Sequence, residues 1–240
     1  SSKARMKIGD GPNDEGASRY HVIRECERSL KRLKRDHIDI YFMHEWDGLT
    51  PLDETLEALA TLQQQGKIRY IGCSNYAAWQ VVEAAWTART HGLNPFVSHQ
   101  DEYSLVFRKP EAELMPASRK YGIGMLPYFP LASGLLTGKY AGDVIPDATR
   151  RALNPTLGGR ITPQVFPAVA AYLGIAARHG LDPAQMAVAF CLTRPFPCIP
   201  IIGASTTDQL KTVLGAADIT LSSDVLDEID AAHREHRQPY

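Results

Sequence analysis

The sequence lacks the long apolar runs and the charge excess that mark several classes of protein. No apolar stretch approaches the ~18–20 residues that a membrane-spanning helix needs, and the first residues are not a secretory signal. With 26 Lys and Arg against 27 Asp and Glu, the formal net charge is −1, which provides no field to gather nucleic acid or an anionic membrane. We therefore expect a cytoplasmic protein without nucleic-acid or membrane partners.

Two kinds of short motif are also missing. The four cysteines form no C-x-x-C pair and have apolar neighbours, which predicts reduced thiols and neither a disulfide framework nor a metal site. Gly9 and Gly11 could begin a dinucleotide-binding glycine loop, but the next glycine, Gly16, lies five residues on instead of three. The sequence therefore does not predict a glycine-rich phosphate loop.

What the sequence does contain is a short apolar run, 38–43, that ends in a histidine. Five of its six residues are apolar, which is typical of a strand covered on both faces, and the run is too short for a helix. In parallel sheets, ligands bind at the carboxyl ends of the strands. His44, directly after this strand, is therefore a candidate functional residue; a histidine that is satisfied within the core is the alternative.

Strands and helices are predicted to alternate along the whole chain. Strands are expected near 1–8, 38–43, 68–73, 96–99, 124–128 and 198–203. Helices are expected at 18–33, 51–66 (capped by Thr50), 75–91, 110–121, 167–179, 183–193, 207–215 and 225–236. The Pro- and Gly-rich region 141–163 is expected to be a long loop on the ligand side.

This alternation, at intervals of about thirty residues, is typical of right-handed β-α-β units. It predicts an α/β fold, a single (β/α)8 TIM barrel over residues 1–240 in which two N-terminal βα units are absent. An open, doubly wound sheet is the alternative.

The motifs at the predicted strand ends resemble those of the aldo-keto reductase superfamily. They are Ser2-Lys3, Asp39-Ile40-Tyr41 through His44 and Trp46-Asp47, Ile71-Gly72-Cys73-Ser74-Asn75, Gln100-Asp101-Glu102-Tyr103-Ser104-Leu105, Pro127-Tyr128 through Tyr140, and Ile202-Gly203-Ala204-Ser205. The resemblance implies a barrel that binds NADPH and reduces aldehydes or ketones, or runs the reverse oxidation.

The resemblance also implies a role for each matching residue. Lys3 would lower the pKa of a catalytic tyrosine, His44 would orient the substrate carbonyl, and Trp46 would form part of the substrate wall. The implied cofactor-binding residues are Ser74, Asn75 and Gln100 for the nicotinamide carboxamide, Tyr128 for stacking on its ring, and Leu131, Ser133, Gly203, Ser205 and Gln209.

Two departures from the family pattern qualify these expectations. The family's catalytic aspartate and proton-donating tyrosine lie upstream of the position of Lys3, so we expect the sequence to continue before Ser1. No cation precedes Lys211 in the run 203–209, where a residue pairing with the 2′-phosphate of NADPH is usual, so NAD is a second possible cofactor.

Two other functions stay open. One is a cofactor-sensing or regulatory protein that resembles the potassium-channel β-subunits. The other is a barrel lyase or isomerase that uses His44 with Glu45 or Asp47 as acid and base. The sequence predicts neither the carbonyl substrate nor the oligomeric state.

Overall fold

A computed structural model describes residues 1–240, which form two compact units. Unit 1 comprises Ser1–Asp101 and Glu111–Met125, and unit 2 comprises Glu102–Pro110 and Leu126–Tyr240. Each unit is described by itself below. The organisation as a single domain stays a prediction.

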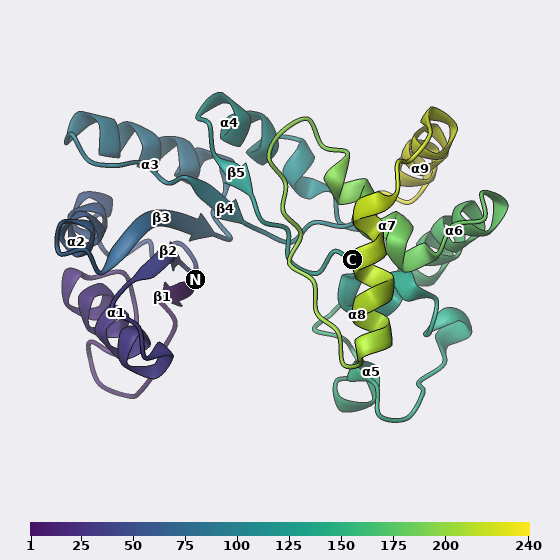
Figure 1. The fold of residues 1–240 in the computed structure, drawn as a ribbon, viewed down its shortest axis with the longest axis horizontal. Coiled ribbons are helices and arrows are strands. Elements are labelled where there is room, and N and C mark those ends of the chain that lie inside the picture. The colour runs from purple at the N-terminus through teal and green to yellow at the C-terminus, as the bar shows by residue number, and fades with distance from the viewer. The chain divides into compact units, whose positions relative to one another are not determined.

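Unit 1 is built on a parallel sheet of five strands in the order β1-β2-β3-β4-β5 (Figure 1). The strands are β1 (Ser2–Ala4), β2 (Ile38–Met43), β3 (Ile68–Ser74), β4 (Ser98–Gln100) and β5 (Gly124–Met125). The helices that connect them are α1 (Arg19–Leu33), α2 (Leu52–Gln64), α3 (Ala78–Thr90) and α4 (Leu114–Lys120). The predicted α/β class with parallel pairing is confirmed, whereas closure into an eight-stranded barrel stays a prediction.

The core of unit 1 lies between the sheet and its helices. Four of the side chains that enter this core from β2 and β3 belong to alternate positions, as a period of two requires: Tyr41, Met43, Ile71 and Cys73. The first residues of the two strands, Ile38 and Ile68, also belong to the core. They pack with apolar residues of α1, α2 and α3, among them Val22, Leu56 and Val81. The intervening residues, such as Phe42 and Gly72, therefore belong to the opposite face of the sheet.

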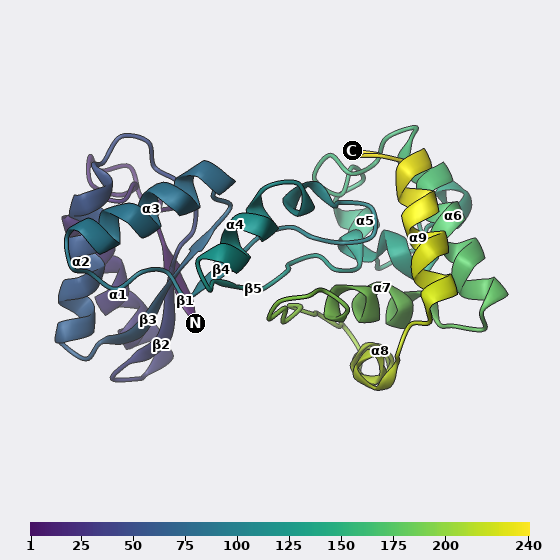
Figure 2. The same ribbon diagram turned by 90° about the horizontal axis from the view of Figure 1, so that it is seen from above.

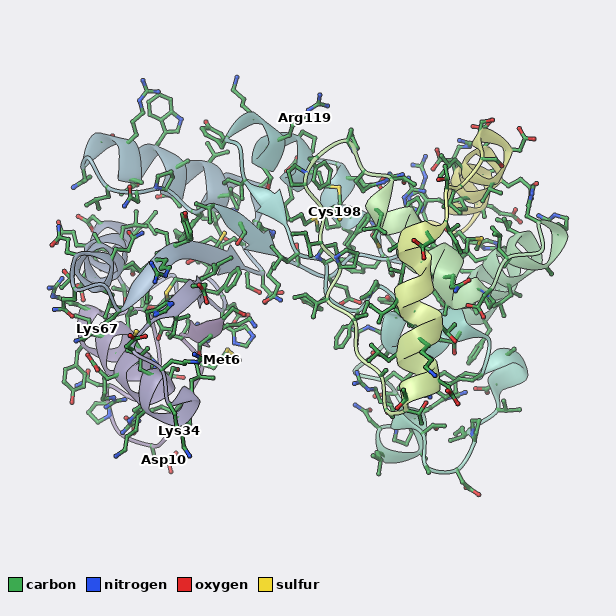
Figure 3. The ribbon with its side chains drawn as sticks, viewed as in Figure 1. Met6, Asp10, Lys34, Lys67, Arg119 and Cys198 are labelled. Atoms are coloured by element: carbon green, nitrogen blue, oxygen red, sulfur yellow. The ribbon has the colours of Figure 1, made fainter.

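The helix ends show which local signals operate. Ser18 caps α1 as predicted, with its hydroxyl accepting from the His21 N–H, and the helix ends at Lys34 in the left-handed conformation, φ 53° (Figure 3). Thr50 was wrongly predicted to cap α2. Pro51 holds the cap position, because the Thr50 hydroxyl donates instead to Asp47.

Unit 2 is mainly helical. Its α-helices are α5 (Arg150–Leu153), α6 (Val165–Arg178), α7 (Pro183–Leu192), α8 (Thr207–Leu214) and α9 (Ser223–Glu235). Short 3-10 turns of the chain span Lys109–Glu111, Ala132–Thr137, Ala141–Asp143 and Gly215–Asp218. Figure 2 shows α9 lying beside α6. No helix of the chain is both long enough and apolar enough to cross a membrane.

The strand predicted at 198–203 is wrong, because only isolated bridge positions form there, at Cys198 and Ile201. Ile201 is bridged in parallel to Tyr128, and its N–H donates to the Pro127 carbonyl at 2.7 Å. Pro197 and Pro200 have no N–H to offer, so a continuous ladder cannot form. Pro127 similarly limits the predicted strand 124–128 to two residues.

Candidate active site

Parallel register places the candidate residues of unit 1 in two rows. Lys3 pairs with Phe42, Phe42 with Gly72, and Gly72 with Ser98, which forms a first row across four strands. Ser74 pairs with Gln100 two residues further along, on the same face. His44, one residue after Met43, is level with Ser74, because Met43 pairs with Cys73. The second row thus lies at the carboxyl ends of the strands.

The side chains of the first row lie next to those of the second, two residues earlier along the strands. A Cβ added to Gly72 would lie 2.5 Å from Cε1 of Phe42, so the phenyl ring occupies the space above the glycine. The Lys3 ammonium lies 5.8 Å from the centroid of the same ring. Burial lowers the pKa of Lys3. A partly desolvated cation therefore lies beside the row that contains His44.

His44 is half-buried at the end of β2, and its backbone N–H donates to the Ala4 carbonyl at 2.9 Å. Burial lowers the pKa of His44, the charge of Lys3 lowers it further, and Glu45 opposes both. Glu45 itself pairs with Arg5 at 3.2 Å. The imidazole is therefore neutral at pH 7, and a neutral ring can both donate and accept a hydrogen bond.

Asn75 connects three strand ends. Its backbone is left-handed, with φ 57°, which asparagine tolerates better than most residues. Its Nδ2 donates to the His44 carbonyl at 2.9 Å and to Ser74 Oγ at 3.1 Å, and its N–H donates to the Gln100 carbonyl at 3.1 Å. The amide side chain of Asn75 therefore joins the ends of β2 and β3, and its backbone N–H joins β3 to β4.

Gln100 carries an unsatisfied acceptor. Its side chain is buried, with the residue 6% exposed, and Oε1 has no hydrogen-bond partner. Ser98, two residues earlier on the same face, also has a buried hydroxyl without a partner. Buried polar atoms of proteins are normally paired, so these groups mark a place where an external donor would be favourable.

Trp46 belongs to an aromatic group at the same edge. Its ring meets Tyr76 edge-on at 5.3 Å and Trp79 at 5.6 Å, and its carbonyl accepts from Arg5 at 3.4 Å. Trp79, 60% exposed, was not predicted as a site residue. No spacing in the sequence distinguishes it from a core residue of α3.

Asp47 acts as a structural brace. Its Oδ2 accepts from the N–H of Ala17 at 2.9 Å and from the N–H of Thr50 at 3.2 Å. Burial works to raise the pKa of Asp47, but these hydrogen bonds prevail and hold it below its ordinary value. A carboxylate fixed in this way is poorly suited to the acid–base role that the lyase alternative requires.

Tyr128, Leu131 and Ser133 belong to unit 2. Tyr128 lies between two bridge partners, Glu102 and Ile201, and the following turn is left-handed at Phe129, Ala132, Ser133 and Gly134. Within the turn, the N–H of Gly134 donates to the Leu131 carbonyl at 2.8 Å. Leu131 itself packs against the cluster of Val188, Val213 and Ala216.

Gly203, Ser205 and Gln209 lie before and on the first turn of α8, and all three are exposed. The Ser205 N–H donates to Gln209 Oε1 at 2.9 Å, and Thr206 caps the helix by accepting from the Gln209 N–H. A Cβ added to Gly203 would meet nothing within 4 Å. This segment is therefore open, and Gln209 already serves as a local cap.

Two cations near the left-handed turn were not assigned from the sequence. The Lys139 ammonium would lie 2.9 Å from a Cβ on Gly134, and the Arg150 guanidinium lies 5.7 Å from the Phe129 ring centroid. Arg151 and Arg160 of the same region pair with Asp143 and Glu102, whereas Lys139 and Arg150 form no ion pair. In the sequence, Arg150 is marked only by its presence in the loop 141–163 predicted on the ligand side, and Lys139 only by its presence in the matching stretch that ends at Tyr140.

The structure thus brings six predicted residues together at one edge of unit 1: Lys3, His44, Trp46, Ser74, Asn75 and Gln100. The other six belong to unit 2, and their convergence with the first group stays a prediction. The buried tyrosines of unit 1, Tyr41 and Tyr76, have pKa values raised by burial, so neither is suited to donate the proton. No His, Cys, Asp and Glu side chains gather as a metal site would require.

Comparisons with known proteins show the family of this chain. The model of the aldo/keto reductase family matches residues 1–234. The chain is 40% identical to Protein tas of Escherichia coli, over 94% of the chain and 70% of that protein. It is 38% identical to the uncharacterized oxidoreductase YrpG of Bacillus subtilis, over 90% of the chain and 65% of that protein. It is 37% identical to a probable voltage-gated potassium channel subunit beta of Oryza sativa, over 93% of the chain and 70% of that protein.

Proposed function

The chain belongs to the aldo/keto reductase family of oxidoreductases, and we propose that it transfers hydride between a nicotinamide cofactor and an aldehyde, a ketone or the corresponding alcohol. One observation carries the proposal. Lys3, His44 and Asn75 meet at one strand edge together with Gln100, whose buried acceptor has no partner.

The substrate end of this site would be formed by His44, Lys3 and Trp46. A carbonyl that receives hydride develops negative charge on oxygen, and a neutral imidazole can donate a hydrogen bond to that oxygen. The Lys3 ammonium adds positive charge on the same side. The Trp46 ring would exclude water from the apolar part of the substrate. The tyrosine that would donate the proton stays a prediction from the sequence.

The residues present fit a nicotinamide. When bound, the reduced ring supplies the hydride. Its carboxamide needs one acceptor and one donor, and the Gln100 Oε1 atom offers a buried acceptor while the Ser74 hydroxyl, also buried, offers a second polar group. Tyr128 would stack on the ring and Leu131 would contact it.

The cations Lys139 and Arg150 support a dinucleotide such as NADPH as the cofactor, through its phosphate groups. Phosphate groups require positive charge, and these are two cations beside the Phe129–Gly134 turn that no carboxylate neutralises. The N–H groups at the start of α8, near Ser205, offer a further place for a phosphate. NAD remains the alternative cofactor until affinities are measured.

Fluorescence titration tests the cofactor assignment. Addition of NADPH should quench tryptophan fluorescence through Trp46, and Lys139→Met or Arg150→Met should weaken the binding of both NADPH and NADH, because both cofactors carry a pyrophosphate. Lys120→Met, at an exposed lysine in the last turn of α4, is the control and should change neither affinity. No quenching by either cofactor at high concentration would count against the assignment.

A regulatory role on the same scaffold is the second candidate, because the chain resembles potassium-channel β-subunits of plants at 36–37% identity. Steady-state reduction of carbonyl compounds by the protein separates the two, since brisk turnover is incompatible with a purely sensory role. For the oxidoreductase we propose a small-molecule partner rather than nucleic acid or a membrane, with the oligomeric state left open. The free cysteines support a cytoplasmic location.

A further inference from the structure

An ion pair in unit 2 ties the loop 141–163 to the segment that follows β4. Arg160 Nε donates to Glu102 Oε1 at 2.9 Å, and its Nη2 donates to Oε2 at 2.6 Å. Each of the two side chains is only 12% exposed. Two parallel hydrogen bonds fix the plane of the guanidinium as well as its position.

The same guanidinium faces two aromatic rings. Its carbon lies 4.5 Å from the ring centroid of Phe129 and 5.7 Å from that of Tyr240. The Tyr240 hydroxyl donates to Glu102 Oε1 at 3.2 Å, and its ring stacks on Phe107 at 5.9 Å. We call Glu102, Phe107, Phe129, Arg160 and Tyr240 the Arg160 cluster.

This cluster contacts Tyr128 from two directions. Phe129, its neighbour in sequence, meets the Tyr128 ring edge-on with centroids 5.2 Å apart. Glu102, its neighbour across the β-bridge, is the carboxylate that Arg160 holds. The ring of Tyr128 therefore contacts Phe129, and its backbone is bridged to Glu102; Arg160 contacts the side chains of both these residues.

We propose that Arg160 is a positioning residue for the cofactor: paired with Glu102 and stacked on Phe129, it holds the Tyr128 ring in the orientation that receives the flat face of the nicotinamide. This inference rests on the proposed function. Arg160 itself does not contact the cofactor in this inference. Its substitution should therefore weaken only the binding of the nicotinamide end.

Binding of NADPH and of 2′,5′-ADP, which lacks the nicotinamide, separates this role from a general one. In Arg160→Gln, the Kd for NADPH should rise about tenfold, as the loss of a well-oriented stacking contact would produce, while that for 2′,5′-ADP stays within about twofold. Glu102→Gln should behave alike, and the double variant should be no worse than either single one, because both act through one pair.

Arg108→Gln is the matched control, because Arg108 also pairs with a carboxylate, Asp230 at 2.8 Å, and stacks on a ring, Phe190 at 5.0 Å. If Arg160→Gln does not fold, Phe129→Leu keeps the ion pair and tests the same contact with Tyr128. If Arg160→Gln raises the Kd for NADPH and for 2′,5′-ADP equally, or changes them as Arg108→Gln does, the inference about Arg160 is wrong, while the proposed function still stands. If the unchanged protein binds neither ligand, the proposed function fails, and the inference fails with its premise.

Discussion

The two units hold their candidate residues by different physical means. In unit 1, strand register places Lys3, His44 and Gln100, so their positions follow from backbone hydrogen bonds between neighbouring strands. In unit 2, Tyr128 and Ser133 lie on a left-handed turn, and contacts between residues far apart in the sequence support it, such as Glu102 with Arg160. Regular pairing can be inferred from sequence patterns, whereas such contacts cannot. Four predictions sharpen or break this contrast.

The largest effect should come from the histidine that β2 delivers. His44→Ala should lower turnover of a carbonyl substrate by about 10²–10³-fold, or about 3–4 kcal/mol, because a preorganised hydrogen bond to the developing oxyanion is lost. NADPH affinity should be kept. His37→Ala, at a partly exposed histidine before β2, is the control. An unchanged kcat in His44→Ala would show that this side chain, although it lies at the strand end, takes no part in catalysis.

The next effect concerns the buried histidine of β4. Burial lowers the pKa of His99 from 6.5 to about 4. Between those pH values the unfolded chain binds a proton that the folded chain does not, so the free energy of unfolding falls as the pH falls. The loss attributable to His99 between pH 7 and pH 4 should be about 3 kcal/mol.

Urea unfolding of the wild type and of His99→Gln at both pH values measures this contribution. The variant should lose about 3 kcal/mol less than the wild type on acidification. Ser98→Ala, at a buried residue of β4 that carries no titratable group, should leave the difference between the two pH values as in the wild type. Equal acid sensitivity of the wild type and His99→Gln would show that other groups dominate.

A pair of glycines compares the packing of the two units directly. Gly72→Ala would bring a Cβ to 2.5 Å from the Phe42 ring, and overpacking of this kind costs about 1–3 kcal/mol. Gly203→Ala in unit 2 meets nothing within 4 Å and should change the free energy of unfolding by less than about 0.5 kcal/mol. If the two variants lower the free energy of unfolding equally in denaturant, the close packing of Phe42 against Gly72 is wrong.

The same contrast explains what could be predicted from the sequence. The apolar run before His44, the cap at Ser18 and the alternation of strands and helices as far as β5 are local signals, and the structure confirms them. Beyond β5 the predicted alternation is wrong, because only helices and isolated bridges follow. The strand expected at 198–203 is wrong because the missing N–H groups of Pro197 and Pro200 outweigh the apolar pattern of that segment.

Within the candidate site, the strand-end residues of unit 1 could be predicted because a parallel sheet collects its carboxyl ends at one edge. Trp79 could not, since an exposed tryptophan on α3 has the same spacing as a core residue. Lys139 and Arg150 could not be chosen over Arg151 and Arg160 either. Which of these cations remain unpaired depends on the folded positions of Asp143 and Glu102.

The smallest effect on stability is expected at Gln100, where a substitution should change cofactor binding but hardly change the free energy of unfolding. Gln100→Met keeps the length of the side chain and removes a buried acceptor that has no partner, so the free energy of unfolding should stay the same or rise by about 1 kcal/mol. The Kd for NADPH should nevertheless rise about tenfold, because a hydrogen bond to the carboxamide is lost. Asn75→Ala, which removes a side chain that is already hydrogen-bonded to His44, should instead weaken stability and NADPH binding together. If Gln100→Met destabilises the fold as Asn75→Ala does, the unpaired acceptor serves the sheet, and the place assigned to the nicotinamide beside it is wrong.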